Sequence, residues 1–226
     1  MKAIKKFCDN YKHSLWIIVY MIFYMLGFAI LENAEHRHYH VIHSWLDDQI
    51  PFCEYFVIPY FLWFAYIFVG VCWFIFFCKD RREYYQLVSV LALGMTIFLV
   101  VSCIYPNKQD LRPTVFANNN IFTQMVQALY ATDTPTNVLP SIHVFNSLAM
   151  FYAINRSPQL KKYRGVRVFC GVLSISIVLS TMFLKQHSVV DVSLGILLSV
   201  ALQMFGEYIF QNQGAGYRKE NLRRIY

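Results

Sequence analysis

Long runs of apolar residues, separated by short polar stretches, dominate the chain. A helix needs about 20 mostly apolar residues to cross a membrane. Five runs reach or nearly reach that length: Ser14 to Leu31, Tyr55 to Cys78, Leu87 to Tyr105, Val166 to Leu184 and Val189 to Phe210. A sixth run, Ser141 to Ile154, is shorter. The pattern predicts an all-α polytopic membrane protein with six transmembrane helices, in a single domain over residues 1–226.

The composition supports this prediction. Hydrophobic residues make up 57% of the 226 residues and charged residues only 15%, whereas a soluble domain is about a quarter charged and under half apolar. The balance excludes a disordered chain and argues against a soluble one. The cysteines show no metal-like or CxxC spacing, so we interpret them as small apolar residues and not as a disulfide framework; they are Cys8, Cys53, Cys72, Cys78, Cys103 and Cys170.

The first run follows a basic start, as in a signal peptide, but it is too long for a typical signal core. Leu31-Glu32-Asn33 offers no small-residue cleavage site. We interpret the run as an uncleaved signal anchor.

The basic residues indicate how the chain is oriented. The chain has 20 Lys and Arg against 13 Asp and Glu. Six crossings place 16 of the basic residues on one side and only Arg37, Lys108, Arg112 and Lys185 on the other. Since basic loops stay in the cytoplasm, we expect both termini there, and the surplus implies no nucleic-acid partner. The lack of an organellar signal favours a bacterial inner membrane.

Polar residues at helix ends on the sparsely charged side are candidates for chemistry, because burying them is costly without a purpose. Pro140 suits the first turn of a helix, and Ser141 with the neighbouring free N–H groups predicts an anion-binding helix start. His143 would lie just inside that turn. His187 and Asp191 are four residues apart, so a helix would place them on one face. The carboxylate could then bond one imidazole nitrogen and leave the other free as a nucleophile.

Two histidines, a supporting carboxylate, an arginine and a helix start are suited to phosphoryl transfer. Arg112 and the helix start would hold the phosphate, one histidine would attack, and the other would protonate the leaving oxygen. These groups supply the positive field themselves, so we expect no metal or other cofactor.

The order and spacing of these residues resemble the type 2 phosphatidic acid phosphatase (PAP2) superfamily of membrane phosphatases and lipid phosphotransferases. Its first motif matches at Arg112-Pro113, with Tyr105 where lysine is usual. Its second matches at Pro140-Ser141-Ile142-His143, with Ile142 in place of glycine. Its third matches at Ser180, His187 and Asp191, with Thr181 in place of arginine. The resemblance covers roughly Tyr105 to Gly195 and implies a PAP2-like helical bundle.

The resemblance also implies roles. His187 would form a phosphohistidine, Asp191 would orient it, His143 would be the general acid, and Arg112 and Ser141 would bind phosphate. Two usual cationic ligands are absent, and we hypothesise that Lys108 and Lys185 replace them. The Asn137 to His143 stretch is also similar to the branch of sphingomyelin and inositol-phosphorylceramide synthases.

The length of the short run predicts how deep the site lies in the membrane. Fourteen residues rise about 21 Å as a helix, less than a hydrocarbon core of about 30 Å. We therefore expect Ser141 and His143 below the membrane surface, where a lipid phosphate headgroup could meet them.

Two alternatives stay open. His36, His40 and His43 would share one face of a helix, which permits a metal site, but we favour an amphipathic segment on the outer surface. As for function, we expect a lipid phosphatase acting on the extracytoplasmic side on a phosphatidic acid or polyprenyl phosphate type of lipid. The alternatives are a lipid phosphotransferase that moves a phospho-headgroup to an alcohol, and a noncatalytic lipid transporter.

Overall fold

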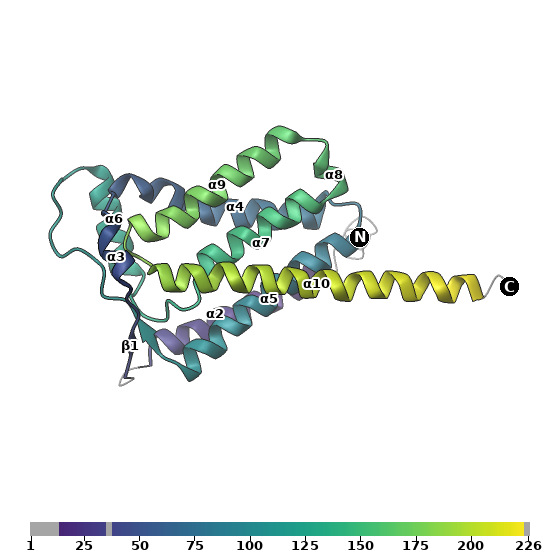
Figure 1. The fold of residues 1–226 in the computed structure, drawn as a ribbon, viewed down its shortest axis with the longest axis horizontal. Coiled ribbons are helices and arrows are strands. Elements are labelled where there is room, and N and C mark those ends of the chain that lie inside the picture. Colours follow the sequence, from purple (N-terminus) through teal and green to yellow (C-terminus); the bar gives the residue numbers. More distant parts are fainter. Residues whose placement is uncertain (1–13, 35–37, 224–226) are drawn as a thin grey trace, which may run out of the picture.

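The computed structural model describes residues 14–34 and 38–223, with side chains as far as residue 209, and this part of the chain is mostly helical (Figure 1). Five helices are long and apolar enough to cross a membrane. They are α2 (Leu15–Glu32), α4 (Val57–Phe76, preceded by the 3-10 turn η2, Glu54–Phe56), α5 (Arg81–Ile104), α9 (Arg164–Phe183) and α10 (Val189–Arg223). These helices confirm five of the predicted apolar runs as helices. The basic N-terminal tail, Cys8, His36 and Arg37 lie outside the described residues.

Large apolar side chains cover the outside of these helices. On α2, Trp16 is 64% exposed, and on α4, Phe68 is 70% exposed. An aqueous surface with this much apolar area would drive association, whereas lipid chains solvate it at no cost. The exposed faces therefore fit the membrane class that the composition indicates.

The short apolar run forms α7 (Ile142–Arg156), which lies at the centre of the bundle and packs against α4, α5, α9 and α10. Its 15 residues rise about 22 Å. Each of those four helices turns a glycine toward α7: Gly70, Gly94, Gly171 and Gly195. A Cβ on Gly94 would lie 2.0 Å from Cζ of Phe145. Small residues let helix backbones approach closely in membranes, and here they let a buried central helix fit among its neighbours.

The helices alternate in direction, so polar segments gather at two ends. The basic stretches 79–82 and 156–167, with α8 (Pro158–Lys161), lie at one end, as Figure 1 shows. At the opposite end lie α3 (Trp45–Gln49), α6 (Ile121–Thr132) and the paired strands β1 (His40–Val41) and β2 (Asn107–Lys108). The loops that the charge count groups together are therefore at one end of the bundle.

The histidine-rich segment is not the helix that its spacing predicts. His40 and Val41 form a short strand parallel to Asn107 and Lys108, and the next helix, α3, starts only after Ser44 caps it. The alternating backbone of a strand separates side chains that a helix would align. Within the described part of the chain, no group of three or more His, Cys, Asp or Glu side chains is arranged to hold a metal.

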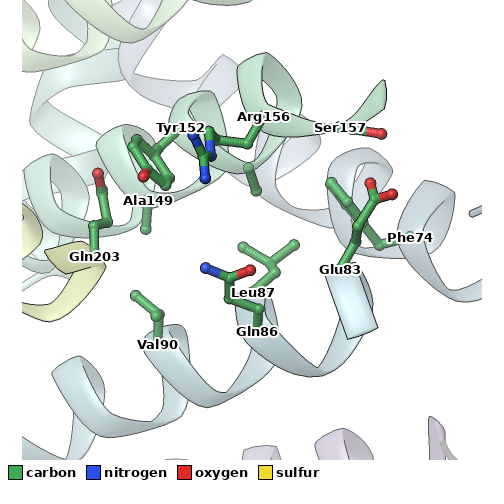
Figure 2. A pocket seen from close by; sticks show the side chains of 11 residues that line it. Phe74, Glu83, Gln86, Leu87, Val90, Ala149, Tyr152, Arg156, Ser157 and Gln203 are labelled. Carbon is green, nitrogen blue, oxygen red and sulfur yellow. The ribbon is translucent and has the colours of Figure 1, made fainter. Parts of the chain in front are cut away.

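A cavity of about 180 Å³ opens at the basic end of the bundle (Figure 2). Its lining includes Glu83 and Gln86 of α5, Tyr152 and Arg156 of α7, and Gln203 of α10. Arg156 and Tyr152 both bond Glu207, and the Arg156 Nη2 to Oε1 distance is 2.8 Å. This cavity lies at the C-terminal end of α7, whereas the residues singled out in the sequence surround its N-terminal end.

Candidate functional site

His143 meets His187 and Asp191, which lie more than 40 residues later in the sequence, at the N-terminal ends of α7 and α10. Nδ1 of His187 lies 2.6 Å from Oδ2 of Asp191, and Nε2 of His187 lies 3.3 Å from Nδ1 of His143. All three side chains are buried, with exposed fractions of 7%, 0% and 9% for His187, Asp191 and His143. An ionised carboxylate can only accept a hydrogen bond, so Asp191 selects the tautomer with hydrogen on Nδ1 of His187. The Nε2 lone pair then points toward His143.

The two helices that carry these residues are tied together at their starts. The backbone N–H of Ser141 donates to the carbonyl oxygen of Asp191 at 3.1 Å. One turn later, a Cβ on Gly195 would lie 2.8 Å from the carbonyl oxygen of Ser141. Only a residue without a side chain permits this approach. Gly195 thus brings the start of α7 against the helix that bears Asp191.

His187 reaches Asp191 from a turn and not from a helix, which corrects the prediction that the two share a helical face. Helix α10 begins at Val189, and the N–H groups of Gln186 and His187 both donate to the carbonyl oxygen of Thr181, at 2.9 and 3.0 Å. Lys185 takes a left-handed backbone conformation, with φ of 53°. Thr181, which stands where the resembled motif has arginine, therefore fixes the turn through its backbone.

Lys185 does not join the histidine pair, which corrects its expected role as a phosphate ligand. Its Nζ donates to the carbonyl oxygens of Asp47 and Ile50, at 2.6 and 2.5 Å, and so caps the end of α3. The carboxylate of Asp47 in turn accepts from Ser188 Oγ at 2.6 Å and from the N–H of Val189 at 2.7 Å, and so caps the start of α10. This reciprocal arrangement, which we call the α3–α10 clasp, holds the turn on both sides of His187.

Arg112 bonds Gln186, the residue that precedes His187 in the chain. Its Nη2 donates to Oε1 of Gln186 at 2.5 Å and its Nη1 donates to the carbonyl oxygen of Tyr130 at 3.2 Å. The guanidinium stacks on the Tyr130 ring, 4.5 Å from the centroid. Burial lowers the pKa of Arg112, and the charge of Asp133 opposes that shift. Arginine keeps its charge under any such shift, so a fixed cation is bonded to the residue that precedes His187.

Lys108 and Tyr105 belong to the structure that supports the site. Lys108 lies on β2, half-buried and paired with Val41 through the backbone. Tyr105, at the position where the resembled motif has lysine, stacks its ring on His40 with a centroid separation of 4.3 Å. Among the described contacts, Lys108 pairs with β1 through its backbone. None of these contacts joins Lys108 to another residue that was expected to bind phosphate.

The loop that leads into α7 is fixed by two buried polar side chains. Oδ1 of Asn107 accepts the N–H groups of Val138 and Leu139 at 2.8 and 2.9 Å. The carboxylate of Glu32, at the end of α2, accepts from Nδ2 of Asn137 at 2.8 Å. These three bonds fix the backbone that leads to Ser141.

Helix α7 starts one residue later than expected, which corrects the predicted position of Pro140. Ser141 is the N-cap, and its Oγ accepts the N–H of Val144 at 3.5 Å, while Pro140 precedes the cap. The N–H groups of Ile142 and His143 have no acceptor within the helix, as at any helix start. The predicted helix start is therefore present, with Ser141 fully buried as its N-cap, while anion binding there stays a prediction.

Aromatic residues and a second carboxylate complete the site, and sequence reasoning missed them. Tyr60 and Trp63 of α4 pack against the His143 ring, with centroid separations of 4.8 and 4.4 Å. The hydroxyl of Tyr60 donates to Oδ2 of Asp133 at 3.0 Å. The spacing of Tyr60 and Trp63, three residues apart on an apolar helix, could have indicated a shared face. Nothing in the sequence places Asp133 beside that face.

The separation of 3.3 Å between Nε2 of His187 and Nδ1 of His143 is too short for a phosphoryl group to lie between the two rings. An attacking nitrogen lies about 3 to 3.5 Å from phosphorus, and an acid nitrogen lies about 2.6 to 3.2 Å from the leaving oxygen. A phosphoryl group between the rings therefore requires the two nitrogens to move apart by more than about 2 Å.

Comparison with protein-family models, with curated proteins and with the solved structures gives no significant match to this chain.

Proposed function

We propose that this chain is an integral membrane enzyme that cleaves a lipid phosphoester through a phosphohistidine at His187. The observation that supports this most directly is the buried series Asp191, His187 and His143, with separations of 2.6 and 3.3 Å. An activated imidazole facing a second imidazole is the arrangement that nucleophilic attack with general acid help requires.

The reaction follows from the tautomers. Nε2 of His187 attacks phosphorus, and the bond between phosphorus and the lipid oxygen breaks. His143 gives its proton to that oxygen, which leaves as an alcohol. Asp191 stabilises the positive charge that develops on the His187 ring. Water then attacks the phosphohistidine, His143 takes a proton from the water, and phosphate leaves while His187 regains its free Nε2.

Arg112 and the start of α7 would hold the phosphate oxygens. A guanidinium and free backbone N–H groups stabilise charge that grows on phosphoryl oxygens in the transition state. The resemblance to the PAP2 superfamily supports the same roles for Arg112 and Ser141. It also supports a PAP2-like bundle of six crossings, in which α7 is the fourth along the chain and joins the five long helices. A helix start about 22 Å from the far end of α7 would meet a headgroup below the membrane surface.

The distribution of basic residues supports a location on the extracytoplasmic face. The basic segments lie at the end of the bundle opposite to the histidine pair, and the positive-inside rule supports a pair that faces outside, with both termini in the cytoplasm. A bacterial inner membrane is the membrane we propose.

One observation favours a second candidate, transfer of a phospho-headgroup from a phospholipid to an alcohol. Lys185 is engaged with α3, and the charges of Arg112 and Asp133 act on each other. A site with one fixed guanidinium and a nearby carboxylate suits the single negative charge of a phosphodiester better than the double charge of a phosphomonoester. In this case a lipid alcohol replaces water in the second step.

The test uses purified full-length protein in detergent or liposomes, with chelator present. Phosphate released from phosphatidic acid or a polyprenyl phosphate supports the phosphatase, and headgroup transfer that requires an added lipid alcohol supports the transferase. His187→Ala is expected to abolish either activity, while the control His40→Ala, an exposed histidine on β1, retains it. No turnover with any of these lipids, or full activity in His187→Ala, contradicts the proposal.

A further inference from the structure

Tyr60 links the ring of His143 to a carboxylate on another helix. Its ring lies 4.8 Å from the His143 ring, with an interplanar angle of 34°, and its hydroxyl donates to Oδ2 of Asp133 at 3.0 Å. Tyr60 belongs to α4 and Asp133 follows the last residue of α6. The contact therefore joins two elements that lie 73 residues apart in the chain.

Both members of this pair are held rigidly. Tyr60 is 1% exposed and packs in a cluster with Val57, Val126 and Leu184. The backbone N–H of Asp133 donates to the carbonyl oxygen of Leu129 at 2.8 Å, which fixes the residue at the end of α6. A hydrogen bond to a charged group is stronger than one between neutral groups, so Asp133 determines where the Tyr60 hydroxyl and its ring lie.

The electrostatic environment connects Asp133 to the histidine pair. Burial raises the pKa of the Asp133 carboxyl, while the Tyr60 hydroxyl and the charges of His187 and Arg112 lower it. The charges of Asp133 and Arg112 therefore act on each other, whereas Asp191 bonds His187 from α10. Each histidine is thus linked to a carboxylate. Asp191 bonds His187 directly, and Asp133 bonds the Tyr60 hydroxyl, whose ring packs on His143.

We propose that Tyr60 and Asp133 are positioning residues that fix the orientation of His143 as general acid; this rests on the proposed function. Trp63 covers the His143 ring as well, with a centroid separation of 4.4 Å. A general acid contributes about 10²- to 10⁴-fold to a rate, and a misplacement of about 1 Å costs up to about 10²-fold. A Tyr60 ring freed from Asp133 lets the imidazole tilt away from the leaving oxygen.

The experiment compares two phosphoesters that differ in the leaving group. A lipid phosphoester leaves as an alkoxide that needs a proton, whereas a nitrophenyl phosphoester leaves without one. Tyr60→Phe keeps the ring and removes the bond to Asp133. We expect it to lower kcat about 10- to 100-fold on the lipid ester, with KM little changed, and to lower the nitrophenyl rate less than about 3-fold.

Two further variants make the result specific. Asp133→Asn is expected to show the same dependence on the leaving group, and the double variant is expected to lose no more than Tyr60→Phe alone, because the two residues act as one unit. Tyr66→Phe is the matched control. Tyr66 lies on the same helix, is buried, and accepts a bond from Ser174 Oγ at 3.2 Å instead; its removal should change neither rate.

The outcomes separate this inference from the proposed function. Equal losses on both esters in Tyr60→Phe, or full lipid activity in both single variants, overturn the positioning role while the enzyme assignment stands. Wild-type protein that turns over neither ester overturns the proposed function, and the positioning role with it.

Discussion

The ammonium group of Lys185 lies 2.6 Å from the carbonyl oxygen of Asp47, and the carboxylate of Asp47 bonds Ser188 and Val189 beyond it. Lys185 thus caps the end of α3, the helix that contains Asp47, and Asp47 caps the start of α10, the helix that follows Lys185. Cations stabilise the C-terminal end of a helix, and carboxylates stabilise the N-terminal end. The α3–α10 clasp therefore fixes the turn between Lys185 and Ser188, which contains His187.

Replacing Asp47 should loosen this turn. Asp47→Ala removes the bonds from Ser188 Oγ and from the N–H of Val189, together with the bond from the N–H of Ser44 at the start of α3, at a residue that is 2% exposed. Hydrogen bonds to charged groups contribute about 1.5 to 3 kcal/mol each, so we expect a loss of about 3 kcal/mol in the free energy of unfolding. Thermal unfolding in detergent measures it. Asp48→Ala is the control, since the Asp48 side chain is 60% exposed and bonds only His43 among the described side chains. Equal shifts in the two variants would contradict the clasp.

The clasp and the phosphate hypothesis make different predictions for Lys185. If Lys185 serves the clasp, Lys185→Met lowers thermal stability and leaves the affinity for orthophosphate, measured by inhibition or calorimetry, within about twofold. Arg112→Met should weaken that affinity by about tenfold or more, because it removes a charge-assisted contact worth about 1.5 to 3 kcal/mol. Orthophosphate binding that weakens equally in both variants would restore Lys185 as a phosphate ligand.

The close crossing of α7 and α10 should tolerate no side chain at Gly195. In Gly195→Ala the new Cβ meets the carbonyl oxygen of Ser141 at 2.8 Å, and backbone atoms cannot rotate away. We expect about 1 to 3 kcal/mol of destabilisation, the usual cost of overpacking, together with loss of activity. Gly165→Ala on α9 is the matched control, since its Cβ would meet nothing within 4 Å and alanine favours a helix. A Gly195→Ala protein as stable as Gly165→Ala would show that the helices are not in contact there.

The buried carboxyl of Asp133 should make stability depend on pH. Burial raises the pKa of Asp133 in the folded protein. A carboxyl with a raised folded-state pKa favours folding while protonated; this contribution is complete below its unfolded pKa of about 3.9 and disappears as the pH rises through the folded value. Asparagine does not titrate, so Asp133→Asn does not lose stability in this way as the pH rises. The thermal midpoint of Asp133→Asn minus that of wild type should therefore increase from pH 4 toward neutrality. A difference that stays constant with pH, or decreases, would contradict the buried position of Asp133.

Run length alone predicted the long helices, because hydrocarbon thickness sets a minimum length that apolar runs must satisfy. The ends of α2 and α9 lie within two residues of the predicted runs, while α5 begins at Arg81, six residues before its run. Polar residues of the first turns of α5 face the cavity near the basic end, so hydropathy gave no sign of them.

The histidines and Asp191 were identifiable because an ionisable group at the end of an apolar run needs a reason to be buried. The partners of Lys185 were not, because α3 lies 135 or more residues earlier in the chain. The Ser44-to-Asp47 spacing does predict a capped helix start, yet it does not show what that helix touches. The contact between Asp133 and Tyr60 could not be predicted for the same reason, because a single sequence contains no distances between separate elements.

A phosphorylated His187 is the central claim, and direct detection tests it. Wild-type protein is mixed briefly with a substrate lipid labelled in its phosphoryl group, denatured in alkali, digested, and analysed by mass spectrometry. We predict an acid-labile, alkali-stable phosphate on the peptide that contains His187, absent from His187→Asn and present in the His40→Ala control. Turnover with no phosphate on His187, or with the phosphate on another residue, would contradict the proposed mechanism.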